Sequence, residues 1–125
     1  MGGLRALIDT SVLIGGTSHA EELGVSAWAV STVSIGELQA GVLLAEEAEA
    51  RAGRLRRLSA VLAAAPVLPV DQYVAMRYGE LRAASGRAPT NDLWIAATAL
   101  SHELTLLTAD AKQASLPLVA TQLVT

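Results

Sequence analysis

Short apolar runs alternate with longer helical patterns along the chain, and this alternation predicts an α/β fold. Residues 4–8 form an apolar run that ends at Asp9, residues 27–33 form a second run rich in β-branched side chains, and residues 104–108 form a third. Runs of this length and composition are typical of buried strands. Because strands that alternate with helices build parallel sheets, we expect a mostly parallel central sheet with helices on both faces.

The rest of the chain carries helical patterns and two weaker strand signals. In the segment from Ser34, the residues Leu38, Val42 and Leu43 have helical spacing. The next segment, 43–65, is predicted as either one helix or two helices divided at Gly53, with Pro66 as its stop. Asp71 is expected to cap a helix whose apolar positions are Val74, Tyr78 and Leu81. A helix is predicted to begin after Asp9, and a turn with helical potential after Asp110. The other predicted helices cover residues 34–43, 43–65, 71–85 and 90–102, and brief strands are predicted at 67–70 and 118–120.

Length and composition limit the class of protein. A chain of 125 residues is served by one hydrophobic core, so we expect a single domain over residues 1–125. Cysteine is absent, which excludes thiolate chemistry and is compatible with a reducing compartment. The longest apolar stretch, residues 58–70, is interrupted by two prolines and is shorter than the ~20 residues that a membrane helix needs. We therefore expect a cytoplasmic protein.

The charge balance favours a local contact with nucleic acid over a general one. The formal net charge is −3, so the surface as a whole does not attract a polyanion. Four arginines are nevertheless clustered within residues 51–57. One interpretation is a solvated helix face paired with Glu46, Glu47 and Glu49. The other is that these arginines, or Arg87 and Lys112, flank a site that binds RNA.

Four acidic residues occupy related positions in the predicted fold. Asp9 and Asp110 follow the carboxyl ends of predicted strands, while Glu37 and Asp92 lie in the first turns of predicted helices. In open α/β sheets, ligands bind at the carboxyl ends of the strands, where the strand order reverses. We therefore expect the four side chains to gather at one end of the sheet.

Each acid also has a purely structural explanation. Glu37 would complete a capping box with Ser34, and Asp92 would offset the positive end of its helix dipole. Asp9 and Asp110 would each cap a following helix. These explanations treat the residues singly, whereas the coincidence of all four favours a shared site.

Carboxylates gathered in one cleft repel each other, and a divalent cation removes this conflict. Oxygen ligands of this kind favour Mg²⁺ or Mn²⁺. A structural zinc site is not expected, because the chain has no cysteine and its two histidines, His19 and His102, are expected at the surface.

The four acids lie within segments that resemble PIN-domain ribonucleases, and most closely the VapC-type toxins of bacterial toxin-antitoxin pairs. The resemblance spans essentially the whole chain. It is carried by the segments Leu7-Ile8-Asp9-Thr10-Ser11-Val12-Leu13-Ile14, Val30-Ser31-Thr32-Val33-Ser34-Ile35-Gly36-Glu37-Leu38, Asn91-Asp92-Leu93-Trp94-Ile95-Ala96-Ala97 and Leu106-Leu107-Thr108-Ala109-Asp110.

This resemblance implies a PIN-like three-layer α/β/α sandwich and a Mg²⁺- or Mn²⁺-dependent endoribonuclease. Asp9, Glu37, Asp92 and Asp110 match the acidic catalytic and metal-binding site. Thr10, Ser11 and Thr108 match polar positions that orient ligands of the metal. The resemblance further implies an RNA substrate, a homodimer and a cognate antitoxin that inserts a segment near the acidic pocket. For the mechanism, we expect the metal held by these acids to activate water for in-line attack on an RNA phosphodiester.

Other classes of protein share some of these sequence features. A PIN-fold module that binds RNA or protein without catalysis is the main alternative. A phosphotransfer receiver needs paired acids after the first strand, and a haloacid-dehalogenase-like phosphatase needs Asp-x-Asp, but this chain has Asp9-Thr10-Ser11. Trp28 and Trp94 are expected in the core or at a dimer contact, and not as platforms for RNA bases.

Overall fold

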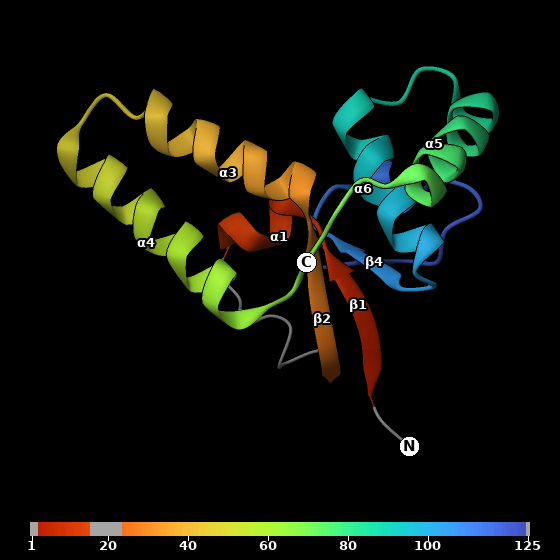
Figure 1. The fold of residues 1–125 in the computed structure, drawn as a ribbon, viewed down its shortest axis with the longest axis horizontal. Coiled ribbons are helices and arrows are strands. Elements are labelled where there is room, and N and C mark those ends of the chain that lie inside the picture. The colour runs from red at the N-terminus through yellow and green to blue at the C-terminus, as the bar shows by residue number, and fades with distance from the viewer. Residues whose placement is uncertain (1–2, 16–23, 125) are drawn as a thin grey trace.

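The computed structural model describes residues 3–15 and 24–124, which form a five-stranded sheet between layers of helices (Figure 1). The strands lie in the order β3-β2-β1-β4-β5, and all neighbouring strands are parallel. The strands are β1 (Leu4–Ile8), β2 (Val25–Ser31), β3 (Val67–Leu68), β4 (Thr105–Thr108) and β5 (Thr121–Leu123). The predicted α/β fold with a parallel central sheet is confirmed.

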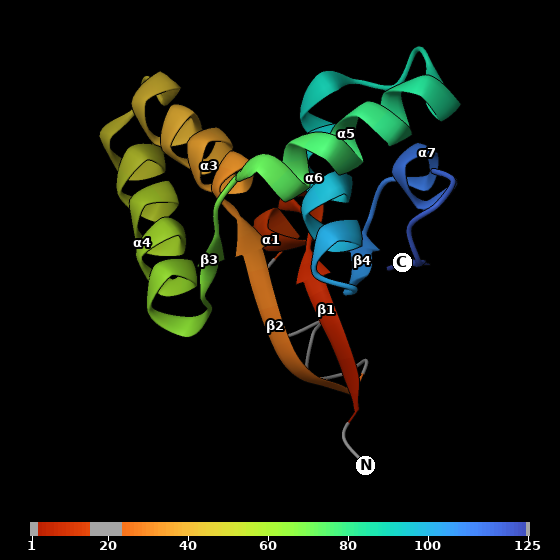
Figure 2. The same cartoon turned by 45° about the vertical axis from the view of Figure 1, so that its right-hand side comes forward.

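Helices cover both faces of this sheet, because successive side chains of each strand point to opposite sides. On one face Ile8, Val30 and Leu107 pack in a core with side chains of α1, α3 and α4. On the other face Leu7 and Leu106 pack with α5 and α6. The helices are α1 (Thr10–Gly15), α3 (Thr32–Leu44), α4 (Ala48–Ala64), α5 (Gln72–Ser85), α6 (Thr90–Ser101) and α7 (Ala111–Ala114). Figure 2 shows the α3–α4 pair and the α5–α6 pair on opposite sides of the strands.

The two cores account for most of the predicted apolar positions. Leu7 and Leu106 are fully buried, and burial of one such side chain contributes about 1.5–3 kcal/mol relative to its exposure. Trp94 stacks on Tyr78 with ring centroids 3.9 Å apart, and Trp28 packs against the core of the opposite face. Both tryptophans are thus placed as expected for core residues.

The strand order reverses between β1 and β4. From the central β1 the sheet continues through β2 and β3 on one side, and through β4 and β5 on the other. Asp9 follows β1 directly, and Asp110 lies two residues beyond the end of β4. The fold therefore brings both residues to the end of the sheet where parallel α/β proteins bind ligands.

The start of α3 differs from the sequence prediction. β2 ends at Ser31, whose side chain accepts a hydrogen bond from the backbone N–H of Val33, so the helix begins at Thr32 and not after Ser34. Leu43, predicted as an apolar contact of this helix, is 63% exposed, whereas Val42 is buried.

Of the two predictions for residues 43–65, one helix or two helices divided at Gly53, the structure has the single helix. α3 ends at Leu44 and α4 begins at Ala48, while Gly53 lies inside α4. The guanidinium of Arg51 donates to the carbonyl of Ala45 at 3.0 Å, and that of Arg54 donates to the carbonyl of Gly41 at 2.7 Å. Cations at these carbonyls offset the negative end of the α3 dipole and hold α4 against it.

The last strand lies three residues later than predicted. Leu118 has a φ of 71°, a left-handed conformation that no regular strand uses, and the N–H of Val119 donates to the carbonyl of Pro117. Residues 121–123 pair with β4 in place of 118–120.

The predicted cap of α5 is confirmed, since the carboxylate of Asp71 accepts from the N–H of Val74 at 2.9 Å. In the described part of the chain, no helix has the length and hydropathy of a membrane span.

Candidate active site

Asp9 is a buried carboxylate held by three neighbouring donors. It is 4% exposed. Its Oδ2 accepts from the hydroxyl of Ser11 at 2.5 Å, from the backbone N–H of Ser11 at 3.2 Å and from the hydroxyl of Thr108 at 3.1 Å. All three donors reach the same oxygen, and Oδ1 receives no hydrogen bond from the described residues. The cap predicted at Asp9 is present, and one carboxylate oxygen remains available as a ligand.

Glu37 is held by α1 and not by a capping box. It is the sixth residue of α3, in the second turn, so the predicted position in the first turn is wrong and Ser34 lies inside the helix. The hydroxyl of Thr10 donates to Oε1 of Glu37 at 2.7 Å, and the side-chain amide of Asn91 lies 3.5 Å from Oε2. Contacts from α1 and α6 therefore direct this carboxylate towards the other acids.

Asp92 is the acidic residue whose pKa is shifted by the other three acids. It lies in the first turn of α6, as predicted, and its side chain accepts no hydrogen bond from the described residues. Burial and, in decreasing order of effect, the negative charges of Asp9, Asp110 and Glu37 together raise the pKa of Asp92 from 3.8 to about 6. A single carboxyl thus experiences the fields of the three other predicted acids, so the structure brings all four together.

Asp110 caps helix α7, which is the structural explanation that its sequence position also allowed. Its Oδ1 accepts from the backbone N–H of Lys112 at 2.9 Å and caps α7. Its own N–H donates to the hydroxyl of Thr108 at 3.1 Å. This cap leaves Asp110 exposed at the rim of the acidic cluster, where its charge still acts on Asp92.

The acidic side chains suit a divalent cation that keeps several water ligands better than one whose ligands all come from the protein. Among residues 3–15 and 24–124, no three acidic or histidine side chains converge closely enough to ligate one ion together. Mg²⁺ needs only one or two carboxylates and keeps several waters. Asp92, which has an elevated pKa and no hydrogen-bond donor in the described structure, and the open Oδ1 of Asp9 match that requirement. His102 is exposed and takes no part, while His19 lies outside the described residues.

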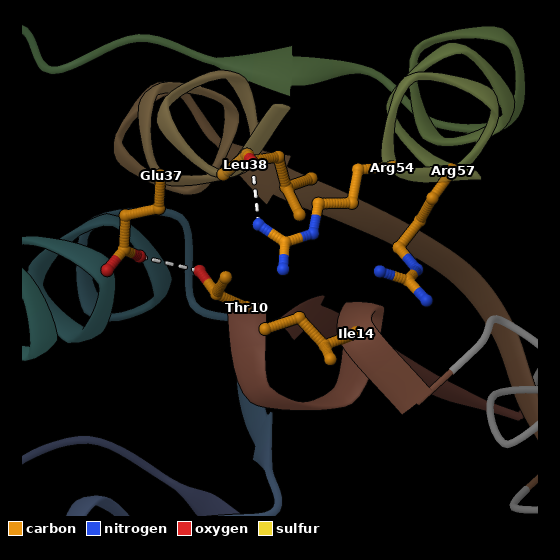
Figure 3. A pocket seen from close by; sticks show the side chains of 7 residues that line it. Thr10, Ile14, Glu37, Leu38, Arg54 and Arg57 are labelled. Atoms are coloured by element: carbon orange, nitrogen blue, oxygen red, sulfur yellow. Dashed lines mark hydrogen bonds between the residues drawn. The ribbon is translucent and has the colours of Figure 1, made fainter. Parts of the chain in front are cut away.

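Two basic pockets adjoin the acids. The first, of about 460 Å³, lies between α1, α3 and α4 and has Thr10, Ile14 and Glu37 on one side and Arg54 and Arg57 on the other. Figure 3 shows both guanidiniums extending from α4 towards Ile14. The pairing of this arginine segment with Glu46, Glu47 and Glu49 is not found among the described residues, where Arg77–Glu80 is the ion pair present.

The second basic pocket, of about 260 Å³, includes Asp92 itself together with Arg87, Lys112 and Gln113. The acids thus have cationic side chains on two sides, as the sequence led us to expect. Gln113 was not predicted as a site residue, although it is only 2% exposed. Its position in a four-residue helix after a strand gives no periodic signal, so only the folded structure identifies it.

The chain is similar to known proteins over nearly its whole length. The family model of the PIN domain matches residues 6–118. Ribonuclease VapC4 of Mycobacterium tuberculosis is 42% identical over 90% of this chain and 92% of its own length, and Ribonuclease VapC5 of the same organism is 41% identical over 83% and 82%. A crystal structure of VapBC-5 from M. tuberculosis, a member of the VapBC family of toxin-antitoxin systems, superposes with a TM-score of 0.81. It is 38% identical and covers 96% of this chain and 97% of its own.

Proposed function

This chain belongs to the PIN-domain family, and from that premise we propose that it is a divalent-metal-dependent endoribonuclease and the toxin of a toxin-antitoxin pair. The observation that carries the proposal is the crowding at Asp92, whose pKa is raised to about 6 by burial and by three other carboxylates. Such crowding destabilises the ionised site, so it is hard to explain as a device for stability. Its relatives among the VapC ribonucleases support the activity.

In this proposal Asp9 and Asp92 hold Mg²⁺ or Mn²⁺, with Glu37 and Asp110 completing the negative site. The bound ion would supply Lewis-acid activation of water and neutralise charge on the scissile phosphate. Oxygen donors alone select a hard cation.

The chain's own polar side chains keep the acids in place. Ser11 and Thr108 both bond to Oδ2 of Asp9, which fixes the rotamer of the carboxylate and turns Oδ1 away from them. Thr10 fixes Glu37 in the same way at 2.7 Å. Each hydrogen bond to a charged group contributes about 1.5–3 kcal/mol, so these hydroxyls reduce the reorganisation needed when substrate enters.

The two basic pockets provide cationic side chains for the RNA backbone on both sides of the acids. Arg54 and Arg57 lie on the Glu37 side, and Arg87 and Lys112 lie on the Asp92 side. An anionic strand bound at both would cross the acidic cluster, although the chain as a whole is negative. Arg57 is the stronger candidate on its side, because Arg54 already bonds to the carbonyl of Gly41.

RNA cleavage by the purified chain tests the proposed activity. We expect cleavage with Mg²⁺ or Mn²⁺, none with EDTA, and none by an Asp9→Asn, Asp92→Asn double variant. Asp71→Asn is the matched control, because Asp71 caps α5 away from the site and asparagine caps equally well. Metal-dependent cleavage that survives in the double variant would overturn the assignment.

A non-catalytic PIN module that binds RNA or protein is the second candidate. The observation in its favour is that, within the described residues, no three candidate ligands converge on one ion. This candidate predicts that Mn²⁺ and RNA bind while every RNA tested stays intact. The nuclease and the module therefore give opposite results in the same cleavage assay.

The toxin role and the assembly are separate parts of the proposal. Solved relatives include VapBC toxin-antitoxin complexes, and FitAcB of Neisseria gonorrhoeae is 26% identical with a TM-score of 0.78. We propose a cognate antitoxin that covers the acidic site, and a homodimer of this chain. Growth arrest on expression, relieved by co-expression of a small protein encoded next to this gene, tests the partner, and the absence of such a protein would contradict it. Light scattering of the purified chain tests the dimer, and a monomeric mass at assay concentration would contradict it.

A further inference from the structure

Gln113 links the end of strand β4 to the first turn of helix α6 through one buried amide. Its side chain is 2% exposed although glutamine is usually found at the surface. Oε1 accepts from the hydroxyl of Thr108 at 3.2 Å, and Nε2 donates to the backbone carbonyl of Asp92 at 3.4 Å. The orientation of the amide follows from its partners, since a carbonyl can only accept and must face the nitrogen.

The hydroxyl of Thr108 has one hydrogen and three neighbouring oxygen acceptors. It lies 3.1 Å from Oδ2 of Asp9, 3.2 Å from Oε1 of Gln113 and 3.3 Å from Oγ of Ser11, and it already accepts from the N–H of Asp110. Asp9 and Gln113 are therefore the two nearest acceptors for its single hydrogen. Through this shared hydroxyl the carboxylate of Asp9 is connected to the amide that bonds to the first turn of α6.

We infer that Gln113 is a positioning residue that couples Asp9 at the end of β1 to Asp92 at the start of α6. This inference rests on the proposed function, because it assigns Gln113 a role in presenting the two carboxylates to one divalent cation. Gln113 touches neither carboxylate directly. It acts through the hydroxyl of Thr108 on one side and through the backbone of Asp92 on the other.

Substitution by a residue of similar shape isolates these two bonds. Gln113→Met keeps the length of the side chain and removes both hydrogen bonds. We expect Mn²⁺ affinity, measured by calorimetry without RNA, to fall about tenfold to hundredfold, the range typical when a group that supports a metal ligand is lost. In RNA cleavage at saturating Mn²⁺, kcat should fall while KM stays unchanged.

Thr98→Val is the matched control. Thr98 is also fully buried in α6, and its hydroxyl bonds to the carbonyl of Trp94 at 2.9 Å, away from the acids. This variant should lower the melting temperature without changing Mn²⁺ affinity. If Gln113→Met behaved in the same way, its role would be structural only and the inference would be wrong.

A double-mutant cycle tests the path through Thr108. Thr108→Val and Gln113→Met remove the same hydrogen bond from its two ends, so their combined loss of Mn²⁺ affinity should be smaller than the sum of the single losses. Additive losses would contradict the coupling. Gln113→Asn, which is shorter and cannot reach both partners, gives the same test if Gln113→Met fails to fold.

The outcomes separate this inference from the proposed function. If the unaltered chain neither binds Mn²⁺ nor cleaves RNA, the proposed function fails and the inference fails with it. If the unaltered chain does both and Gln113→Met binds Mn²⁺ equally well, only the inference is overturned.

Discussion

The hydroxyl of Thr10 donates to the carboxylate of Glu37 across 2.7 Å, and this contact joins the first residue of α1 to the second turn of α3. The two residues are 27 positions apart in the chain. Their contact forms one wall of the acidic site and borders the pocket that contains Arg57 (Figure 3). Glu37 is therefore aimed by a neighbouring helix and not by its own.

Thr10→Val should reduce RNA cleavage without unfolding the chain. The loss of one hydrogen bond to a partly exposed carboxylate costs about 1–2 kcal/mol, which corresponds to a fall of roughly fivefold to thirtyfold in kcat/KM. Steady-state cleavage with Mn²⁺ measures this effect. Thr32→Val, an exposed threonine at the start of α3, is the control and should cleave at the normal rate. Equal rates for both variants would mean that Thr10 does not aim Glu37.

Asp92→Asn should stabilise the chain in EDTA. The pKa of Asp92 is raised from 3.8 to about 6, so the folded state binds this proton more tightly than the unfolded state does. The stability that the protonated form contributes is fully present below pH 3.8 and is lost as the pH rises through about 6. Asparagine removes the penalty, so the melting temperature should rise at pH 8, and the gain should disappear near pH 4.

Asp71→Asn separates this effect from the general effect of removing a negative charge. Asp71 is an exposed helix cap, and asparagine can cap the helix equally well. The melting temperature of the Asp71→Asn variant should therefore change little at pH 8. A stabilisation of Asp71→Asn equal to that of Asp92→Asn would show that net charge, and not local crowding, is responsible.

The affinity for Mn²⁺ should increase with pH up to about 6 and change little above it. Metal and proton compete for the carboxylate of Asp92, whose pKa is about 6, so binding below that pH must displace the proton. Calorimetry between pH 5 and pH 8 measures the change in affinity, and the protons released should decrease over the same range. Affinity that is independent of pH across this range would exclude Asp92 as a ligand.

The positions of the acids could be predicted because each follows from a local signal. Asp9 comes directly after a short buried strand, and Asp92 lies at the start of a helix that is apolar on nearly every side. The strand of residues 118–120 could not be placed correctly, because the left-handed φ of Leu118 leaves no trace in an apolar sequence.

The contacts that hold the acids in place could not be predicted from their sequence positions. Ser34 and Glu37 have the spacing of a capping box, but the helix begins earlier, at a cap formed by Ser31. Gln113 is buried only because α7 packs beside the start of α6, and such a contact between segments 21 residues apart depends on the tertiary fold. Local patterns thus predicted which acidic residues lie near one another at this end of the sheet, while the partners that hold them depend on packing.

Arg57→Ala should weaken RNA binding in a manner that depends on salt. Arg57 is half-buried at the wall of the pocket beside Glu37, and its guanidinium bonds to no group among the described residues, so it is available for a phosphate. For single-stranded nucleic acid, one lost phosphate contact reduces the slope of log affinity against log salt by about 0.7. Fluorescence anisotropy with a labelled RNA in EDTA measures this slope without cleavage. Arg56→Ala removes an exposed arginine of the same helix that does not line the pocket, and it should leave the slope unchanged. Because both variants change the net charge equally, a difference between them reports a local contact, and equal slopes would place the RNA elsewhere.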